Sequence, residues 1–257
     1  MKLQILSDLH FEFYEDGGKE VLSTLDPSNV DVLVLAGDLA TIKFHDSVLN
    51  TLAERFPEVI FILGNHDYYG SSPKEVHKAL VEICAKRKNL HWLHNTSVVL
   101  HGQRFVGTPL WFQEDPMNPV YQRFLNDFRQ IRGFQEWVYE ENKKAMEFLH
   151  KEVTPKDIVI THHVPSLSGV HERFLKEPLN RFFVCNMEKL IQKQNPRMWI
   201  FGHTHECKIF SLGGTSLVCN PRGYMHEAHE NFDPKMVFEI GKTRITRIPN
   251  DKGEVSF

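Results

Sequence analysis

The stretch Val59-Ile60-Phe61-Ile62-Leu63-Gly64-Asn65-His66-Asp67 decides the fold of this chain. Its first five residues are apolar and mostly β-branched, which is typical of a buried strand. Gly64 interrupts the strand and allows the backbone to turn sharply. Asn65 and His66 therefore follow the carboxyl end of a strand, where open α/β sheets place their ligands. The side-chain oxygen of Asn65 can ligate a hard cation, and His66 can donate a proton. One such turn alone would nevertheless favour a structural role, namely a polar turn with a capping Asn.

The same arrangement, an apolar run followed by polar residues, occurs at four more places in the chain. The runs are 2–6, 32–36, 157–161 and 198–201. The polar residues after them are Asp8 and His10, Asp38, His162 and His163, and His203 and His205. Between strands, segments 45–55 and 73–86 have the pattern of helices, which favours parallel β-α-β units. The chain is therefore predicted to have an α/β fold.

The remaining segments give a coarser prediction. Residues 97–107 are expected to form a hairpin. Residues 118–153 are expected to be mainly helical, with a division at Gly133. Two further hairpins are expected near the carboxyl end, one about 213–214 and the other about 241–242. We find no internal repeat, low-complexity segment or linker.

Composition narrows the possible functions. The chain has 257 residues, of which 41% are hydrophobic, so we expect a single domain over 1–257. Its net charge is −3 without a long run of one sign, which indicates neither nucleic-acid nor membrane binding. The four cysteines show no Cys-x-x-Cys spacing and are expected to be reduced. Because no basic-then-apolar leader precedes Asp8, we expect a cytoplasmic protein.

The five polar clusters together offer about seven ligands of mixed oxygen and nitrogen type. Because parallel strands share one carboxyl edge, most of these side chains are expected to converge. Imidazole with carboxylate suits divalent transition-metal ions such as Mn, Fe, Zn or Ni. Seven ligands are too many for one tetrahedral ion, and they suit two ions about 3.5–4 Å apart that share a carboxylate. The predicted cofactor is therefore a pair of divalent transition-metal ions.

In their order along the chain, these motifs resemble those of the calcineurin-like metallophosphoesterases. The motifs are Asp8-x-His10, Gly37-Asp38, Gly64-Asn65-His66-Asp67, Thr161-His162-His163 and Gly202-His203-x-His205. Any one of them alone would be weak, but five in the right order over residues 8–205 are specific. The resemblance implies a four-layer sandwich, in which two packed mixed sheets are flanked by helices and the metal site lies at the carboxyl ends of the strands.

The resemblance also implies a role for each residue of the site. The implied metal ligands are Asp8, His10 and His205 for one ion, Asn65, His162 and His203 for the other, and Asp38 as a bridge between the two. His66 would be the catalytic histidine, oriented by Asp67. His163 adjoins an implied ligand, and it is either the alternative to that ligand or a packing or rim histidine.

Other residues near the predicted site have two possible roles. Arg222 follows the hairpin after His205, so it either grips a phosphate oxygen or caps carbonyls in a structural turn. We take it as the candidate substrate-binding residue. The polar residues of 126–129 either support the site or belong to a solvated helix face. Segment 110–112 is expected to be an exposed-looking aromatic turn, in which packing is the favoured role of Trp111.

The long segment 166–186 directly follows a predicted metal-binding turn. It is expected to be a loop with one short helix that overhangs the site. Long loops in compact domains are often functional, so we expect this one to set substrate choice. The alternative is a surface excursion with buried Phe residues.

These expectations together predict a metal-dependent hydrolase of small phosphate esters. A hydroxide that bridges the two ions would attack phosphorus in line, and His66 would assist the leaving group. A phosphodiesterase is favoured over a phosphomonoesterase or a phosphoprotein phosphatase on the same site. A non-catalytic metal-binding scaffold is the other class of function, and it would be marked by loss of the ligands or of His66. The sequence leaves the oligomeric state open.

Overall fold

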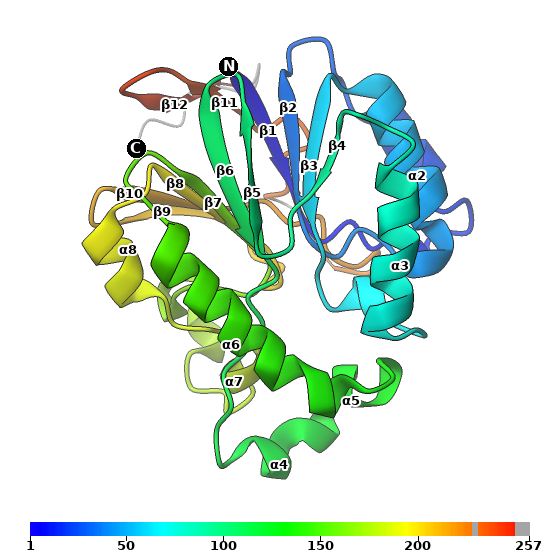
Figure 1. The fold of residues 1–257 in the computed structure, drawn as a ribbon, viewed down its shortest axis with the longest axis vertical. Coiled ribbons are helices and arrows are strands. Elements are labelled where there is room, and N and C mark those ends of the chain that lie inside the picture. The colour runs from blue at the N-terminus through cyan, green and yellow to red at the C-terminus, as the bar shows by residue number, and fades with distance from the viewer. Residues whose placement is uncertain (228–230, 250–257) are drawn as a thin grey trace.

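Two mixed six-stranded sheets form the centre of the molecule in the computed structural model, which describes residues 1–227 and 231–249 (Figure 1). The first sheet has the order β12-β11-β1-β2-β3-β4 and the second β5-β6-β7-β8-β10-β9. The strands of the first are β1 (Lys2–Leu6), β2 (Val32–Ala36), β3 (Glu58–Ile62), β4 (Leu90–Trp92), β11 (Val237–Ile240) and β12 (Ile245–Arg247). Those of the second are β5 (Thr96–Leu100), β6 (Gln103–Thr108), β7 (Ile158–Thr161), β8 (Met198–Phe201), β9 (Lys208–Leu212) and β10 (Thr215–Cys219).

The inner strands of each sheet run parallel. In the first sheet β1, β2, β3 and β4 are parallel, β11 pairs antiparallel with β1 at one edge, and β12 pairs antiparallel with β11. In the second sheet β6, β7, β8 and β10 are parallel, with β5 and β9 antiparallel at the two edges. The predicted hairpins correspond to β5–β6, β9–β10 and β11–β12.

Alternate residues of the inner strands face the opposite sheet. Val32 and Val34 of β2 belong to the cluster between the sheets, which also holds Ile158 and Ile200. Leu33 of β2 instead packs with the helices on the outer face. Because both faces of these strands are buried, their sequences are continuously apolar rather than alternating.

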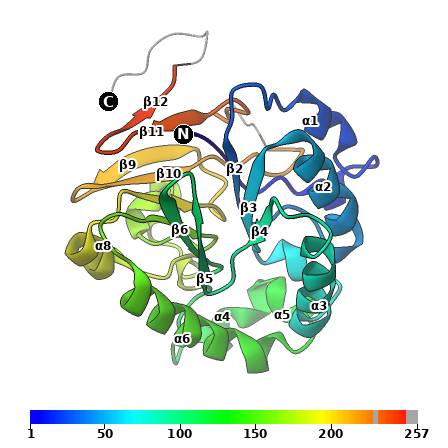
Figure 2. The same cartoon turned by 45° about the horizontal axis from the view of Figure 1, so that its top comes forward.

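Helices complete the outer layers (Figures 1 and 2). The helices beside the first sheet are α1 (Lys19–Thr24), α2 (Ile42–Arg55) and α3 (Pro73–Cys84), and those beside the second are α6 (Phe134–Glu152) and α8 (Glu188–Gln194). Short helices lie beyond the carboxyl ends of the strands, namely α4 (Asn118–Tyr121), α5 (Asp127–Gln130) and α7 (Asn180–Phe183). Single turns of 3-10 helix span Phe11–Phe13, His66–Tyr68, Gln122–Phe124, Leu167–Gly169 and Glu172–Phe174. Within the described residues, no helix is long and apolar enough to cross a membrane.

The structure confirms the predicted α/β fold of two mixed sheets flanked by helices, and it corrects three details. Strand β4 was not predicted. Segment 110–112 is not exposed, because the side chains of Trp111 and Phe112 are fully buried in the core under the first sheet. Segment 166–186 contains more regular structure than one short helix, since two turns of 3-10 helix precede α7.

Candidate metal centre

The predicted site residues meet where the two sheets pack together. Strands β1, β2 and β3 of the first sheet end in Asp8, Asp38 and Asn65, whereas β7 and β8 of the second end near His162 and His203. The strand ends lie on both of the two expected sheets, and the clusters converge because the carboxyl ends of both sheets face the same end of the molecule.

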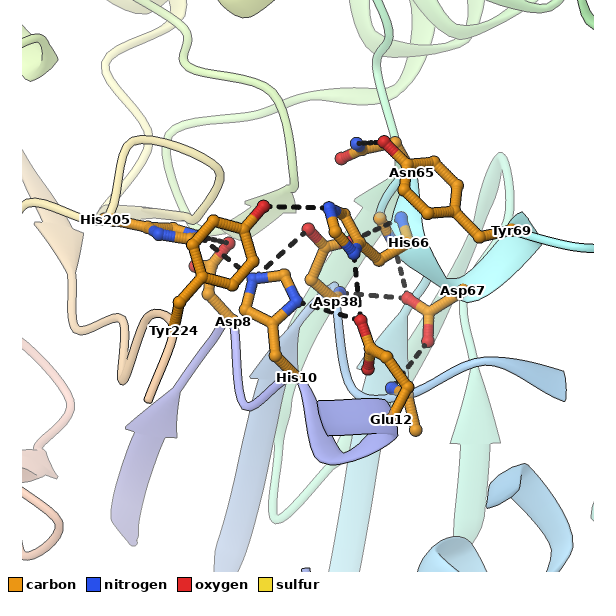
Figure 3. A network of polar contacts seen from close by, with 12 residues as sticks. Asp8, His10, Glu12, Asp38, Asn65, His66, Asp67, Tyr69, His205 and Tyr224 are labelled. Atoms are coloured by element: carbon orange, nitrogen blue, oxygen red, sulfur yellow. Dashed lines mark hydrogen bonds and ion pairs between the residues drawn. The ribbon is translucent and has the colours of Figure 1, made fainter. Parts of the chain in front are cut away.

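Asp8, His10 and His205 form a first cluster, which Figure 3 shows in part. The Nε2 atoms of His10 and His205 are 2.9 Å apart. His205 Nε2 is also 3.6 Å from Asp8 Oδ1. Two imidazole nitrogens and a carboxylate therefore face one another, as the ligands of one ion would.

Asp38, His162 and His203 form a second cluster, with Asn65 beside it. His162 Nε2 lies 3.4 Å from Asp38 Oδ2 and 3.1 Å from Asn65 Oδ1. The same Asp38 oxygen is 3.8 Å from His10 Nε2 in the first cluster. Asp38 thus lies between the two clusters, which is the position that a bridging ligand needs.

The donor set fits two divalent ions. Asp8 Oδ2 and His203 Nε2 are buried, and neither has a hydrogen-bond partner among the described residues. Buried polar atoms are seldom left unpaired in proteins, so these two atoms fit a role as metal ligands. Burial lowers the pKa of His162, but Asp38 and Asp8 outweigh it and raise that pKa to about 9. The carboxylates therefore stabilise positive charge at His162, whereas burial and the neighbouring imidazoles hold the pKa of His203 well below its usual value. The imidazole and carboxylate groups of the cluster suit transition-metal ions.

Outer hydrogen bonds orient three of the predicted ligand imidazoles. Their Nδ1 atoms contact Glu12 Oε1 (3.2 Å from His10), Glu227 Oε2 (2.7 Å from His205) and the Ala36 carbonyl oxygen (2.9 Å from His162). When the imidazole is neutral, an acceptor on Nδ1 fixes the tautomer that leaves Nε2 unprotonated and directed inward, ready to bind a metal ion. This arrangement is usual for histidines that bind metals.

The backbone is strained at most of these positions. Five of the seven predicted ligands have φ between 48° and 70°, a region that residues other than glycine seldom adopt, namely Asp8, His10, Asp38, His203 and His205. Such strain persists only where the surroundings enforce it, and it is concentrated at functional sites. Here the Asp8 N–H donates to the Gly37 carbonyl at 3.0 Å, and the His10 N–H donates to that of Asp38 at 3.0 Å.

Gly64 is needed for close packing, not for a turn that requires positive φ. A Cβ atom there would lie 2.2 Å from Asp38 Oδ1 and 2.6 Å from His162 Nε2. The expected role of Gly64 in the turn is thus corrected: its lack of a side chain lets two predicted ligands pass over the strand end.

Replacing Gly64 with Ala is expected to weaken metal binding as well as folding. The added methyl group must displace Asp38 or His162, and overpacking of this kind costs about 1–3 kcal/mol of stability. Metal titration and thermal melting would measure the two effects. Gly102→Ala is the control for metal affinity alone, because a Cβ there meets nothing within 4 Å, whereas its φ of +78° makes the substitution strained in itself. Equal metal affinity in the two variants would contradict the prediction.

The hydrogen bonds of Asp67 lead to other groups than His66, so they do not support its expected role in orienting that ring. Its Oδ2 accepts hydrogen bonds from the N–H groups of Asp38 at 2.9 Å and Gly64 at 2.7 Å. Its Oδ1 lies 2.9 Å from His45 Nε2. Asp67 therefore ties the loop after β2 to the loop after β3, and it positions Asp38 through the backbone.

Glu12 orients His66 instead (Figure 3). Glu12 Oε1 lies 2.9 Å from His66 Nδ1, and the hydroxyl oxygen of Tyr224 lies 3.0 Å from His66 Nε2. Burial lowers the pKa of His66, but Asp38 and Glu12 outweigh it, so the pKa lies above its usual value. His66 is thus held with Nε2 directed away from Glu12 and with its protonated form favoured.

Replacing Glu12 with Gln is expected to lower kcat by roughly 10- to 100-fold, the usual range for a residue that supports a metal site. The amide would leave His66 and His10 without the carboxylate that fixes both rings. Metal affinity should fall together with kcat, while KM for the ester should change less. Steady-state kinetics and metal titration would test this, with the exposed neighbour variant Glu15→Gln as control. A changed KM with unchanged kcat would contradict it.

Asn65 is supported by a buried carboxylate that the sequence left ambiguous. Asp127 Oδ1 accepts hydrogen bonds from Asn65 Nδ2 at 2.9 Å and from the Tyr69 hydroxyl at 2.6 Å. Burial raises the pKa of Asp127, against the lowering effect of these two bonds. Because the Asn65 amide donates to Asp127, its oxygen is turned towards His162. Asp127 thus supports the site and does not belong to a solvated helix face.

The remaining candidates lie outside the two clusters. The guanidinium of Arg222 stacks on Tyr14 and donates from Nε to its hydroxyl at 2.9 Å, so the prediction that Arg222 grips the substrate is not supported by its position. His163 is fully buried between Trp111 and Phe112 on one side and the predicted ligand His203, whose ring centroid is 4.4 Å away, on the other, so it packs directly behind the second cluster. Segment 166–186 does overhang the site, where the Phe183 ring stacks on His203 with centroids 4.5 Å apart.

Four residues of the site were missed, namely Glu12, Tyr69, Tyr224 and Glu227. Glu12 follows the motif of Asp8 and His10 in the next turn of chain, so its position near a predicted ligand was a usable signal. Tyr224 lies in the same short segment as Arg222. The backbone conformation of this segment decides whether Arg222 or Tyr224 enters the site, and the sequence contains no signal for that conformation.

Comparisons with known proteins agree with this geometry. The family model described as calcineurin-like phosphoesterase matches residues 1–207. A protein of Acanthamoeba polyphaga mimivirus, the uncharacterized protein L509, is 25% identical over 282 residues, covering 96% of this chain and 99% of that protein. Phosphopantetheinyl hydrolase (PptH) from Mycobacterium tuberculosis is similar in structure, with a TM-score of 0.71, 16% identity, and coverage of 99% of this chain and 98% of that chain.

A second solved structure, TT1561 of Thermus thermophilus, has a TM-score of 0.57 at 15% identity, with 86% of this chain and 88% of that chain covered. At such identities the structural likeness shows the fold alone. The family model, however, matches most of the chain, including every motif on which the site is built. The chain therefore belongs to the calcineurin-like metallophosphoesterases, a family of metal-dependent hydrolases.

Proposed function

We propose that this protein hydrolyses phosphodiesters at the centre built from Asp8, Asp38 and their neighbours. The observation that carries the proposal is the convergence of the seven predicted ligands beside His66, which Glu12 holds by Nδ1. His66 is not one of the predicted ligands, although with His10 and Asp38 it forms a third group of side chains close enough to hold an ion. When bound, two divalent ions would supply Lewis-acid stabilisation of phosphate oxygens and a water of lowered pKa.

The protein's own residues have distinct tasks in this proposal. Asp38 lies between the clusters and holds them together. Glu12 keeps the His66 ring in place, so that Nε2 can donate a proton to the departing alkoxide. Tyr224 contacts that same nitrogen at 3.0 Å, and its hydroxyl marks where an oxygen of the substrate would be received.

The charges around the site favour a diester over a monoester. Among the described residues that line the cavities at the site, Lys43 is the only lysine or arginine. The dianion of a monoester needs more compensating positive charge than the monoanion of a diester. Because Arg222 is engaged with Tyr14, the centre is better matched to the diester.

Turnover of two chromogenic esters tests the proposed reaction. Protein loaded with Mn, Fe, Zn or Ni would be assayed on methyl 4-nitrophenyl phosphate and on 4-nitrophenyl phosphate. We expect the higher kcat/KM with the diester. Faster turnover of the monoester would instead support a phosphomonoesterase. No turnover of either ester by protein that holds its metal would support a non-catalytic scaffold.

We predict two bound ions for each chain. Elemental analysis of the purified protein after dialysis should give a ratio near two. His205→Ala should lower this ratio to about one, because it removes a ligand of the first cluster only. The exposed variant His150→Ala should keep the wild-type ratio. A single ion in the wild type would refute the two-ion assignment.

We also propose a reducing compartment such as the cytoplasm as the place where the protein works. The support is that Cys84, Cys185, Cys207 and Cys219 are all free thiols. Cell fractionation with an antibody against the protein would test this location.

A further inference from the structure

Two cavities meet at the His66 ring. One, here called the outer cleft, has a volume of about 970 Å³ and is lined by Glu12, Lys43 and Gln130 among others. The other, here called the ligand chamber, has a volume of about 450 Å³. His66 and Tyr224 line both cavities, so a molecule that passes this pair would occupy both.

The predicted ligands line the ligand chamber only. Those that reach its surface are Asp38, Asn65, His203 and His205. A phosphate group held at the centre must therefore lie at the floor of this chamber, with the leaving oxygen near His66. The substituent that stays on phosphorus then extends into the chamber, and the leaving alcohol extends past His66 into the outer cleft.

The chamber walls near the predicted ligands are apolar and come from two segments. One segment contributes Val170, Phe174, Leu179 and Phe183, and the other contributes Phe124 and Leu125. Val170 is almost fully buried, and Phe183 is fixed by stacking on His203. A preformed apolar wall beside a charged centre is typical of a site that receives an apolar group.

Two of these wall residues are largely exposed. Phe124 is 57% exposed and Phe174 is 43% exposed. Leu167, Leu175, Met117 and Val120 in the same two stretches of chain are exposed as well. Exposed apolar side chains gathered at the mouth of a cavity mark a binding surface rather than a chance arrangement.

The charges that line the chamber disfavour an acidic arm. Besides the predicted ligand Asp38, the described lining contains Asp127, Glu177 and Glu227 but no lysine or arginine. The guanidinium groups of Arg123 and Arg173 lie over the exposed rings of Phe124 and Phe174, 4.7 and 4.5 Å from the ring centroids, so cations stand beside these two wall residues but not in the lining itself. A carboxylate or second phosphate deep on the retained arm would meet the acidic groups of the lining. A neutral apolar chain would instead contact Phe124, Phe174 and Leu179.

We propose that the substrate is a phosphodiester whose retained arm is a neutral apolar chain seated in the ligand chamber, an inference that rests on the proposed function. In the reaction, a water oxygen forms a new bond to phosphorus and gives up a proton. The bond from phosphorus to the leaving oxygen breaks, its electron pair stays on that oxygen, and His66 supplies the proton. The products are an apolar phosphate monoester and a free alcohol.

A series of alkyl 4-nitrophenyl phosphates tests the inference, from methyl to octyl, each below its micelle concentration. The leaving group is the same throughout, so only the retained arm changes. Each fully buried methylene is worth up to roughly a fourfold gain. We expect kcat/KM to rise at least about 10-fold from methyl to octyl. Calorimetry should likewise show octyl phosphate binding the metal-loaded protein at least about 10-fold tighter than methyl phosphate.

Paired surface variants locate the arm. Phe174→Ser and Phe124→Ser should each reduce the ratio of kcat/KM for the octyl ester to kcat/KM for the methyl ester by about threefold or more. Leu175→Ser is the matched control for the first, because Leu175 is 48% exposed but does not line the chamber. Val120→Ser, at 49% exposed, is the control for the second. Both controls should keep the wild-type ratio.

The outcomes separate this inference from the proposed function. If kcat/KM were the same for the octyl and methyl diesters and the methyl diester were turned over well, the proposal of an apolar arm would be wrong. The proposed phosphodiesterase function would still stand. If kcat/KM rose with the length of the alkyl chain but neither Phe124→Ser nor Phe174→Ser changed that rise, the placement of the arm in the ligand chamber would be wrong. No turnover of any diester by metal-loaded protein would overturn the function itself and the inference with it.

Discussion

Asp38→Asn is expected to abolish most of the activity, with a loss of roughly 10²-fold or more. Changing a residue that merely supports a metal site already costs 10- to 100-fold, and Asp38 lies between both clusters. Its Oδ2 is 3.4 Å from His162 Nε2 and 3.8 Å from His10 Nε2. The amide would remove the negative charge that both ions share. Turnover and metal content should therefore fall together.

His163→Ala is the comparison for this variant. His163 is fully buried next to the predicted ligand His162, and its ring packs against Trp111 and against the ring of His203 without belonging to either group of candidate ligands. Its loss should lower the melting temperature and leave the metal content near that of the wild type. If His163→Ala lost metal while Asp38→Asn kept full activity, the ligand assignment would be wrong.

His66→Ala is expected to keep the fold and both metal ions while turnover falls roughly 10²–10⁴-fold, the usual range for one acid–base group. The seven predicted ligands are complete without His66. Its ring is held between Glu12 and Tyr224, with Nε2 available for proton transfer. The loss should depend on the leaving group, because a nitrophenolate departs with little help whereas an alkoxide needs a proton.

The measurement compares a nitrophenyl ester and an alkyl ester of the same phosphate, on wild type and on His66→Ala. The alkyl ester should lose more. Equal losses would mean that His66 acts mainly by binding the phosphate, and a lost ion would mean that it is a ligand. His150→Ala, which removes an exposed histidine outside the site, is the control and should keep the turnover of the wild type.

The sequence alone could predict the fold class and most of the centre. Parallel strands that are buried on both faces are continuously apolar, so the runs before Asp38 and Asn65 were easy to identify. Polar residues directly after such runs must lie at the carboxyl end of a sheet. Local chemistry therefore placed Asp8, Asp38, His162 and their partners at one end of the molecule.

The contacts around those residues could not be predicted in the same way. Asp67 is adjacent to His66 in the chain, yet it bonds to the loop after β2, and Glu12 from the loop after β1 reaches His66 instead. Side-chain direction depends on backbone angles and on packing between distant segments. At these loops φ takes left-handed values that a residue such as His10 seldom adopts, so a prediction from ordinary backbone geometry points the side chain elsewhere.

Arg222 and Tyr224 show the same limit. Both lie in one short segment, and charge favoured Arg222 as the phosphate contact. The tertiary structure stacks Arg222 on Tyr14 and directs Tyr224 towards His66. The sequence by itself thus determined which strand ends carry metal-ligand chemistry, because that follows from local hydrophobic pattern. Only the tertiary structure decided which side chains hold and surround His66, because those contacts join segments that are far apart in the chain.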